Sequence, residues 1–402
     1  MREHQHGDRV KKIGLYLGAR PEGGEFQYQL SLLDALSALN GDGHEVVCGA
    51  AGPEWRQHAA ARGMRSLSAP SSFPGNAVST FWIRAGLPVG AWRATAPFIF
   101  GTARALLAER CDLWIFPTPT ARSFMAPVPA LVSIHDLMHR YEPGFPESSG
   151  GAEYYCRERN LINICRWARG VLVDSETGKR QAVESYGVAP DKVHVLPFVA
   201  APYIREAAVP DDFDARYPLP PKYLFYPAQF WEHKNHKRLI RAVASLKKEL
   251  PDLALVLAGS PKNAFPSFQV LVRELGLTED VHILGYVPDD YMPELYRRAR
   301  ALVMPTFYGP TNIPPLEAFA CGCPVAISGI YAMPEQAGDA ALFFDPKSVD
   351  DIAGCIRRLW SDDRLCADLA ARGRERAAAW GQKQFNERLR CIVERVSGGH
   401  GQ

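Results

Sequence analysis

Short apolar runs alternate along the chain with longer stretches in which apolar residues recur every three or four positions. The short runs predict buried strands at 13–18, 45–48, 113–116, 130–134 and 171–173, and again at 223–226, 253–257, 281–284, 301–304 and after the turn at 321–324. The longer stretches predict helices, as after position 235, where Leu239, Ile240, Val243 and Leu246 share one face. These two series predict an α/β protein with two doubly wound, Rossmann-like domains facing a central cleft.

The pattern weakens between the two series and again near the end of the chain. Residues 200–221 are rich in Pro, Ala and Asp, so we predict a linker there, between domains at 1–199 and 222–380. A C-terminal helix at 381–402 is expected to pack back on the first domain. Within the linker, Asp212-Phe213-Asp214 resembles a D-x-D metal motif, but the absence of a flanking strand favours a solvated turn.

Composition narrows the class of protein. With 402 residues, 47% hydrophobic and 22% charged, the chain can bury two cores, and a net charge of +2 gives no support for nucleic-acid binding. Its nine cysteines form no paired metal-binding motif with histidines, which argues against zinc and suits a reducing compartment. The polar start and the absence of a long apolar run predict a cytoplasmic protein without a spanning helix.

The stretch from 304 to 328 is the strongest candidate for a site. It reads as a strand, a loop rich in Gly and Pro, and a helix that opens near Pro314 and Pro315, which places Glu317 in the first turn. Ligands of open α/β sheets bind at the carboxyl ends of the strands, where this loop lies. Alternatively, Glu317 only complements the helix dipole.

Two further strand ends carry candidate residues. Gly23 and Gly24 lie between a strand and a helix, an arrangement that can point backbone N–H groups at a phosphate but is also typical of a plain tight turn. His135 and Asp136 follow the strand at 130–134. A histidine there is either a core residue bonded to the backbone or part of a site at this sheet edge.

Aromatic residues and arginines interleave between 81 and 110, for example Trp82, Arg84, Trp92 and Arg93. One interpretation is an amphipathic helix with a solvated basic face. The other is an interfacial surface that meets a membrane or a lipid-linked acceptor.

These motifs together resemble the two-domain GT-B glycosyltransferases of the large retaining family 4, in particular the bacterial mannosyltransferase-like branch that builds O-antigen and exopolysaccharide chains. The matching segments are Gly23-Gly24, His135-Asp136, 226–236, 307–328, 334–340 and 344–346. The resemblance implies a GT-B fold, with an acceptor-side first domain and a second domain that binds the nucleotide sugar.

The resemblance also implies a role for individual residues. Lys234 matches the lysine that holds the donor diphosphate, and Glu317 matches the second glutamate of an E-x7-E motif, which binds the ribose. Glu335 lies in the segment near the nucleobase. In the first domain, Gly23 and Gly24 match the loop that backs onto the phosphates, and His135 matches a histidine near the transferred sugar, so we assign His135 and Lys234 as catalytic.

The chain departs from the family pattern at two positions. Gly309 stands where the first glutamate of the motif is expected, and Gln229 stands where an arginine usually helps to hold the diphosphate. The possible substitutes, by proximity, are Asn312, Thr311, His233 and His236, and we assign Asn312 to the donor site.

The resemblance implies a metal-independent, retaining hexosyltransferase that uses a GDP- or UDP-sugar, with a preference for mannose, and needs no other cofactor. The expected acceptor is lipid-linked or an oligosaccharide of a cell-surface polysaccharide, which agrees with a peripheral position at the inner face of the membrane. In this family the departing phosphate oxygen is thought to deprotonate the acceptor. The competing hypothesis is a catalytically silent partner that binds the nucleotide sugar. The sequence has no motif that matches a GT-B phosphorylase or epimerase. It also marks no pair of facing carboxylates, which a glycosidase would need.

Overall fold

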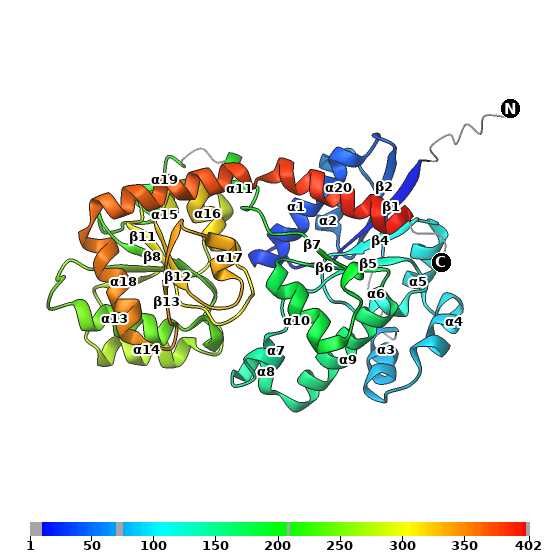
Figure 1. Cartoon of the computed structure of the whole chain (residues 1–402), viewed down its shortest axis with the longest axis horizontal. Helices are drawn as coiled ribbons and strands as arrows, with labels where there is room; N and C mark the ends of the chain where they lie inside the picture. The colour runs from blue at the N-terminus through cyan, green and yellow to red at the C-terminus, as the bar shows by residue number, and fades with distance from the viewer. Residues whose placement is uncertain (1–9, 70–74, 207–209, 399–402) are drawn as a thin grey trace. The chain divides into compact units, whose positions relative to one another are not determined.

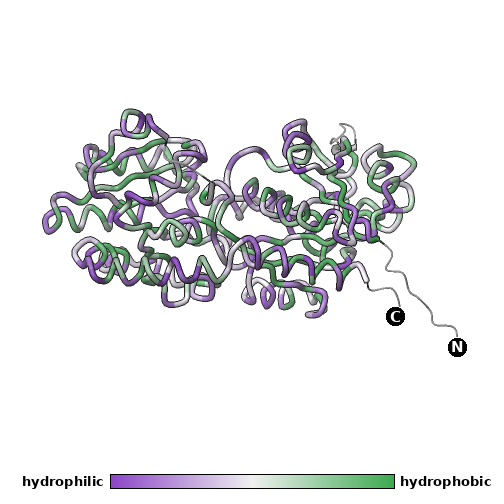
Figure 2. The backbone as a smooth tube through the Cα atoms, turned by 90° about the horizontal axis from the view of Figure 1, so that it is seen from above, coloured by the Kyte–Doolittle hydropathy of each residue, from purple (hydrophilic) through white to green (hydrophobic). Residues whose placement is uncertain are grey.

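A computed structural model describes residues 10–69, 75–206 and 210–398. The chain divides into two compact units. The first contains residues up to Leu137, residues 151–197 and the C-terminal segment from Gln382, and the second contains 138–150 and 198–381. In each unit the hydrophobic segments lie mainly in the central strands (Figure 2).

Within the described residues, the first unit is built on a seven-stranded parallel sheet in the order β3-β2-β1-β4-β5-β6-β7. The strands are β1 (Lys11–Leu17), β2 (His44–Ala50), β3 (Arg65–Ser68), β4 (Leu113–Phe116), β5 (Ala130–Ser133), β6 (Gly170–Val173) and β7 (Val193–Val195). In β1, Ile13 lies between Val46 and Leu113, and all three side chains are buried. Most of these strands are apolar on both faces because helices cover the sheet on either side.

Helices α1 and α20 pack together on one face of this sheet, and α9 lies on the other (Figure 1). The helices are α1 (Gly23–Leu39), α2 (Pro53–Ala61), α3 (Gly75–Arg84), α4 (Val89–Ile99), α5 (Gly101–Ala108), α6 (Arg122–Met125), α9 (Gly151–Trp167), α10 (Glu176–Tyr186) and α20 (Gln382–Gly398), with the 3₁₀ turn η1 (Pro190–Lys192). Ser175 caps α10, because its Oγ accepts a hydrogen bond from the backbone N of Gly178 at 2.9 Å.

In the described part of the second unit, a six-stranded parallel sheet has the order β10-β9-β8-β11-β12-β13. Its strands are β8 (Leu224–Pro227), β9 (Leu255–Ala258), β10 (Val281–Ile283), β11 (Ala301–Met304), β12 (Val325–Ser328) and β13 (Ala341–Phe344). The two parallel, doubly wound domains predicted from the sequence are therefore confirmed. The strand order reverses between β8 and β11, so the loops that follow these two strands diverge. The space between two such loops is where open α/β sheets bind ligands.

Helices cover both faces of the second sheet: α13 packs with α14 and α18, and α16 packs with α15 and α19 (Figure 1). The helical elements are α7 (Met138–Tyr141), α8 (Pro146–Ser149), α11 (Tyr203–Glu206), α12 (Phe213–Arg216), η2 (Glu232–Lys234), α13 (His236–Leu246), α14 (Phe265–Glu274), η3 (Asp289–Tyr291), α15 (Met292–Arg298), α16 (Ile313–Cys321), α17 (Met333–Ala337), α18 (Val349–Ser361) and α19 (Asp363–Ala379).

The segment predicted as a linker is structured where it is described. It carries α11 and α12, and Phe213 is buried in the core of the second unit. The carboxylate of Asp212 accepts a hydrogen bond from the hydroxyl of Tyr291 at 2.9 Å, and Asp214 pairs with Arg298. The prediction of a solvated turn was wrong for Phe213, because the central residue of the D-x-D string supplies core packing.

One other local prediction was wrong. The single amphipathic helix expected between 81 and 110 is instead the end of α3 followed by α4 and α5. The break at Phe100 follows Pro97, which removes a backbone donor near the end of α4. The carboxyl-terminal strand β13 was not predicted as a strand.

Candidate active site

The loops after β8 and β11 bring two of the predicted site residues together. Lys234 follows β8 and Asn312 follows β11, and the Lys234 Nζ donates a hydrogen bond to Asn312 Oδ1 at 3.4 Å. The loops are also joined through their backbones, because the Phe307 N–H donates to the carbonyl of His233 at 2.9 Å. A cation and an amide therefore meet at the point where the strand order reverses.

The backbone on both sides of Lys234 is held in place. The Tyr226 hydroxyl donates to the Lys234 carbonyl at 3.0 Å. Asn235, whose backbone φ is +63°, donates through its side-chain amide to the carbonyls of Pro305 at 3.0 Å and Pro346 at 2.8 Å. Asn235 is 4% exposed. Its hydrogen bonds fix the start of α13 and, because Lys234 directly precedes Asn235, they also fix the backbone at Lys234.

Asn312 is the N-cap residue of α16, and a glutamine side chain holds its backbone. Gln336 Oε1 accepts from the Asn312 N–H at 3.0 Å, and Gln336 Nε2 donates to the Asn312 carbonyl at 2.6 Å. The Asn312 side-chain amide donates to the Tyr308 carbonyl at 3.1 Å. Gln336 lies in the segment 334–340 that carries the family resemblance, but no motif or spacing singles it out.

Gly309 has a backbone conformation that excludes a side chain. Its φ is +87°, and a Cβ at this position would lie 2.6 Å from the Thr311 carbonyl oxygen and 2.9 Å from the Asn312 side-chain nitrogen. A glutamate therefore does not fit this loop as it is folded. Gly309 therefore belongs to a loop conformation in which Asn312 lies against Lys234.

Glu317 lies further along α16 than the sequence predicted. It is the fifth residue of α16, because the helix starts at Ile313, so it is not in the first turn and the alternative of simple dipole complementation is wrong. The residue is 4% exposed, and its carboxylate accepts hydrogen bonds from the hydroxyls of Tyr203 and Tyr296, each at 2.6 Å. These bonds use two of about four lone-pair sites, so the oxygens can still accept from a ligand hydroxyl.

The protonation of Glu317 follows from this environment. Burial raises the pKa of the carboxyl to about 7, although both tyrosine hydrogen bonds favour the charged form and act in the opposite direction. A charged and a neutral form are therefore both accessible near neutral pH. Tyr203 and Tyr296 were not predicted as site residues.

Glu335, by contrast, is exposed on α17. Its backbone carbonyl accepts a hydrogen bond from Arg376 Nη2 at 2.5 Å. This bond fixes the turn that presents Gln336 to Asn312, so the main-chain position of Glu335 is well defined.

The two histidines proposed as substitute cations differ in their surroundings. The His236 ring is 2% exposed and stacks on Phe230 with 4.4 Å between ring centroids. Burial lowers its pKa to about 3, so it is a neutral core residue and cannot replace a cation. His233 stacks on Tyr308 at 4.1 Å. Gln229 Oε1 accepts from the Trp231 indole N–H at 3.0 Å.

The remaining predicted residues lie in the first unit, at the carboxyl edge of its sheet. Gly23, with φ of +78°, opens α1. His135 follows β5, and its ring meets that of Tyr28 edge-on with 5.1 Å between centroids. Burial lowers the pKa of His135, so the imidazole is neutral at physiological pH. The loop before Gly23 is held by Gln29 Oε1, which accepts from two backbone N–H groups.

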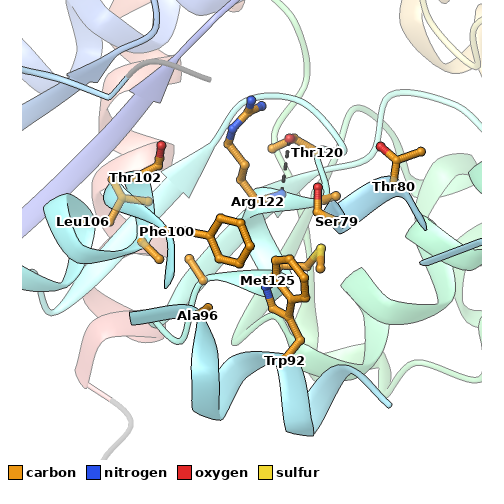
Figure 3. Close-up of a pocket in the computed structure, with 13 residues that line it drawn as sticks. Ser79, Thr80, Trp92, Ala96, Phe100, Thr102, Leu106, Thr120, Arg122 and Met125 are labelled. Atoms are coloured by element: carbon orange, nitrogen blue, oxygen red, sulfur yellow. Dashed lines mark hydrogen bonds between the residues drawn. The ribbon is translucent and has the colours of Figure 1, made fainter. Parts of the chain in front are cut away.

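A cavity of about 310 Å³ lies in the first unit among α3, α4, α5 and α6 (Figure 3). Part of its wall is apolar and aromatic, with Trp92 stacked on Phe100 at 4.5 Å between centroids. The polar residues of its lining are Ser79, Thr80, Thr102, Thr120 and Arg122. Thr120 and Arg122 follow the carboxyl end of β4, next to which the strand order of the first sheet reverses.

The arginines and aromatic residues between 81 and 110 do not form one face. Trp92 is buried, and Arg93 donates to the carbonyls of Phe124 at 2.6 Å and Ala126 at 2.9 Å. Four large apolar residues of α3 and α4 are exposed, namely Val78, Phe81, Phe98 and Ile99, and Phe98 is 80% exposed. In the sequence, each of them lies next to or near a residue that lines the cavity.

Across the described ranges, no three His, Cys, Asp or Glu side chains gather as they would to hold a metal ion. No helix in these ranges is long and apolar enough to cross a membrane.

The chain matches two models of protein families. Residues 28–198 match Glycosyltransferase Family 4, and residues 211–376 match Glycosyl transferases group 1. Among curated proteins, the O-antigen chain mannosyltransferase B of Escherichia coli is 42% identical over 106 residues, which are 26% of either chain. An MMP alpha-(1->4)-mannosyltransferase of Mycolicibacterium hassiacum is 26% identical over 53% of this chain and 51% of its own. The matches thus span about a quarter to half of these relatives.

Solved structures show the same fold at low sequence identity. Anabaena Alr3699/HepE in complex with UDP and glucose has a TM-score of 0.72 and 18% identity, and the match covers 96% of this chain and 100% of the other. WaaG, a glycosyltransferase involved in lipopolysaccharide biosynthesis, has a TM-score of 0.67 and 18% identity over the same shares. With two Rossmann-like sheets and both family models, the chain belongs to the family-4-type glycosyltransferases of the GT-B fold.

Proposed function

We propose that the protein is a retaining hexosyltransferase that moves a mannose-like sugar from a nucleotide sugar to a lipid-linked or oligosaccharide acceptor of a cell-surface polysaccharide. The observation that carries this proposal is the Lys234–Asn312 pair at the ends of β8 and β11. It is supported by relatives named as mannosyltransferases and by a solved neighbour that holds UDP and glucose. We therefore propose GDP- or UDP-sugars as donors.

The proposed chemistry is a substitution at the anomeric carbon. The bond from this carbon to the diphosphate oxygen breaks, the acceptor oxygen forms the new bond on the same face, and its proton passes to the departing phosphate. Lys234 would stabilise the negative charge that develops on the diphosphate. Glu317 would accept hydrogen bonds from the ribose. This scheme needs neither a metal ion nor a carboxylate nucleophile.

The test is a transfer assay with UDP-, GDP- and dTDP-sugars, together with thermal-shift measurements of donor binding. We expect Lys234→Ala to lower kcat/KM by about 10²–10³-fold, the range for loss of one electrostatic contact to a transition state. Lys248→Ala, which alters an exposed lysine, is the matched control. NMR of the product should show that the anomeric configuration is retained. Transfer that is undiminished in Lys234→Ala would disprove the role of the cation.

The resemblance assigns His135 a place near the transferred sugar. We expect His135→Ala to lower kcat while the dissociation constant of the donor stays unchanged, because the residue would contact the reacting sugar and not the nucleotide. A loss of donor affinity without a loss of kcat would contradict this role.

An acceptor with an apolar part is supported by the cavity beside Trp92 and Phe100 and by the exposed residues Phe98 and Ile99. An apolar chain would occupy the aromatic part, and an anionic head group would meet Arg122. The exposed apolar residues would contact the membrane surface. We expect Phe98→Ser with Ile99→Ser to reduce cosedimentation with anionic vesicles, whereas Val270→Ser, at an exposed position of α14, should not. Equal binding by all variants would remove this part of the proposal.

A catalytically silent nucleotide-sugar binder is the second candidate. The conformation of Gly309 favours it, because the loop has no room for the glutamate that would hold the hexose. Donor binding by thermal shift without transfer to any acceptor would support this candidate. Turnover with any donor excludes it.

A further inference from the structure

Residues 138–150 form a strap, a name we use for this segment alone, that leaves the first unit and packs with the second. It follows the strand end that carries His135, and it contains the short helices α7 and α8. Within the second unit, it contacts the two loops that hold Lys234 and Asn312. No pattern in the sequence indicates this contact, because the strap belongs to the first series of strands and helices.

Glu147 is the polar centre of the strap. Its Oε1 accepts hydrogen bonds from the backbone N–H of Glu232 at 2.7 Å and from Asn263 Nδ2 at 2.9 Å, and it lies 3.6 Å from His233 Nδ1. Partial burial opposes ionisation, yet the hydrogen bonds and His233 lower the pKa of the carboxyl to about 2. Glu147 therefore remains charged at neutral pH and holds the η2 turn that ends at Lys234.

An aromatic cluster forms the second contact of the strap. Phe145 packs against Phe307 at 5.1 Å and against Tyr308 at 5.5 Å between ring centroids, and Met138 is buried in the same cluster. Tyr308 in turn stacks on His233. Met138 and Phe145 thus reach the loop after β11, while Glu147 reaches the loop after β8.

A third contact involves Glu142. Its carboxylate accepts from the hydroxyl of Tyr331 at 2.6 Å, and its backbone carbonyl accepts from the hydroxyl of Tyr308 at 3.3 Å. Tyr331 has a backbone φ of +53°, which is unusual for a residue with a side chain. Three separate contacts therefore hold the strap on the loops after β8 and β11, and the third also reaches Tyr331 in the loop after β12.

We propose that the strap is a positioning element of the donor site, in which Glu147 is the positioning residue that fixes Lys234 against the donor diphosphate. Glu147 acts through the Glu232 amide, two residues before Lys234, and through His233, which directly precedes it. In a chain that has glutamine at position 229 and glycine at 309, the loops obtain their order from the strap. The proposal rests on the proposed function for its ligand, a nucleoside diphosphate.

The test compares four variants in binding of GDP and UDP by calorimetry and in backbone hydrogen exchange at 230–236. We expect Glu147→Ala to weaken binding about tenfold and to increase exchange at both Glu232 and Lys234. Glu147→Gln, which keeps an oxygen for both hydrogen bonds, should stay within about threefold of the wild type. Asn263→Ala should give an intermediate loss. Glu153→Ala, at an exposed position on α9, is the control.

A double-mutant cycle separates positioning from general stability. If Glu147 acts through Lys234, Glu147→Ala should add little to the loss already caused by Lys234→Ala, whereas independent effects add. Additive losses, or exchange that is unchanged at Lys234, would overturn the proposal. So would tighter binding by Glu147→Ala, because the carboxylate would then compete with the phosphate.

The outcome does not depend on turnover. If the wild type binds a nucleoside diphosphate but transfers no sugar, the proposed function fails and the binding cycle still decides the role of Glu147. If neither nucleotide binds, hydrogen exchange decides whether the strap orders the loop, and an unchanged pattern in Glu147→Ala disproves it.

Discussion

Glu317 combines burial with two short hydrogen bonds, and this gives the stability of the protein a defined pH dependence. The pKa of Glu317 in the folded state, about 7, lies above its ordinary value of 4.5. The folded state therefore holds the proton more tightly, so the contribution to the free energy of unfolding is complete below about pH 4.5 and is lost as the pH rises through 7. Glu317→Gln should remove this pH-dependent loss in the free energy of unfolding, which amounts to about 3 kcal/mol at pH 8. Urea unfolding at several pH values measures it.

The matched control is Glu279→Gln, at an exposed position outside the predicted site, which should leave the fall in stability as it is in the wild type. In binding assays Glu317→Gln should weaken the nucleotide roughly tenfold, since a neutral acceptor forms weaker hydrogen bonds than a carboxylate does. A variant with wild-type pH dependence would show that Glu317 is not protonated in this range.

Gly309 offers a second prediction at the residue scale. Restoring the glutamate of the family pattern, Gly309→Glu, should destabilise the protein by about 1–3 kcal/mol, because the backbone φ of +87° and the nearby Thr311 carbonyl leave no room for a Cβ. Thermal unfolding measures this cost. Gly309→Ala should carry most of it, which separates backbone strain from the added charge. An increase in transfer by Gly309→Glu would contradict this account.

The sequence predicted site residues only where a motif carried them. Lys234 and Glu317 match local strings, so they could be assigned without coordinates. Tyr203, whose hydroxyl donates to Glu317, lies 114 positions away in the chain. The contact between Gln336 and Asn312 is made by the Gln336 side-chain amide with the Asn312 backbone. No periodicity or spacing reports such long-range contacts.

At the scale of elements, strands were predicted more reliably than helices. β4 and β11 have the predicted bounds, because each is a short apolar run buried on both faces. β3 and β13 were missed, since each lies at an edge of its sheet and is partly exposed. The helices between 81 and 110 were merged because their breaks at 85–88 and at Phe100 are only partly marked by Gly and Pro.

The cap of α10 provides a test at this scale. Ser175→Ala removes the acceptor for the Gly178 N–H and should reduce the free energy of unfolding by about 1 kcal/mol. Ser175→Asp keeps an acceptor and should retain most of the stability. Equal losses in both variants, measured by chemical denaturation, would show that the hydroxyl has a packing role instead.

At the scale of the whole molecule, the chain enters the second unit twice and returns to the first with α20. Sequence reasoning divided the chain at 199 and 222 because it followed composition. It therefore could not detect that 138–150 packs with the second unit, or that Phe213 belongs to a core. Contacts between segments that are distant in the chain determine these assignments.

The helix α20 completes the first unit, so weakening its packing should destabilise that unit alone. Phe385, Leu389 and Val393 are fully buried, and Arg388 donates to the Val195 carbonyl at 2.7 Å. We expect Leu389→Ala to destabilise the first unit by about 2–5 kcal/mol, as for other buried leucines. Hydrogen exchange should then increase in β1 and α1 but not in β8 or α13, because the buried face of α20 belongs to the first unit. Glu387→Ala, on the exposed face of the same helix, is the control. Faster exchange in both units would mean that they unfold as one cooperative structure.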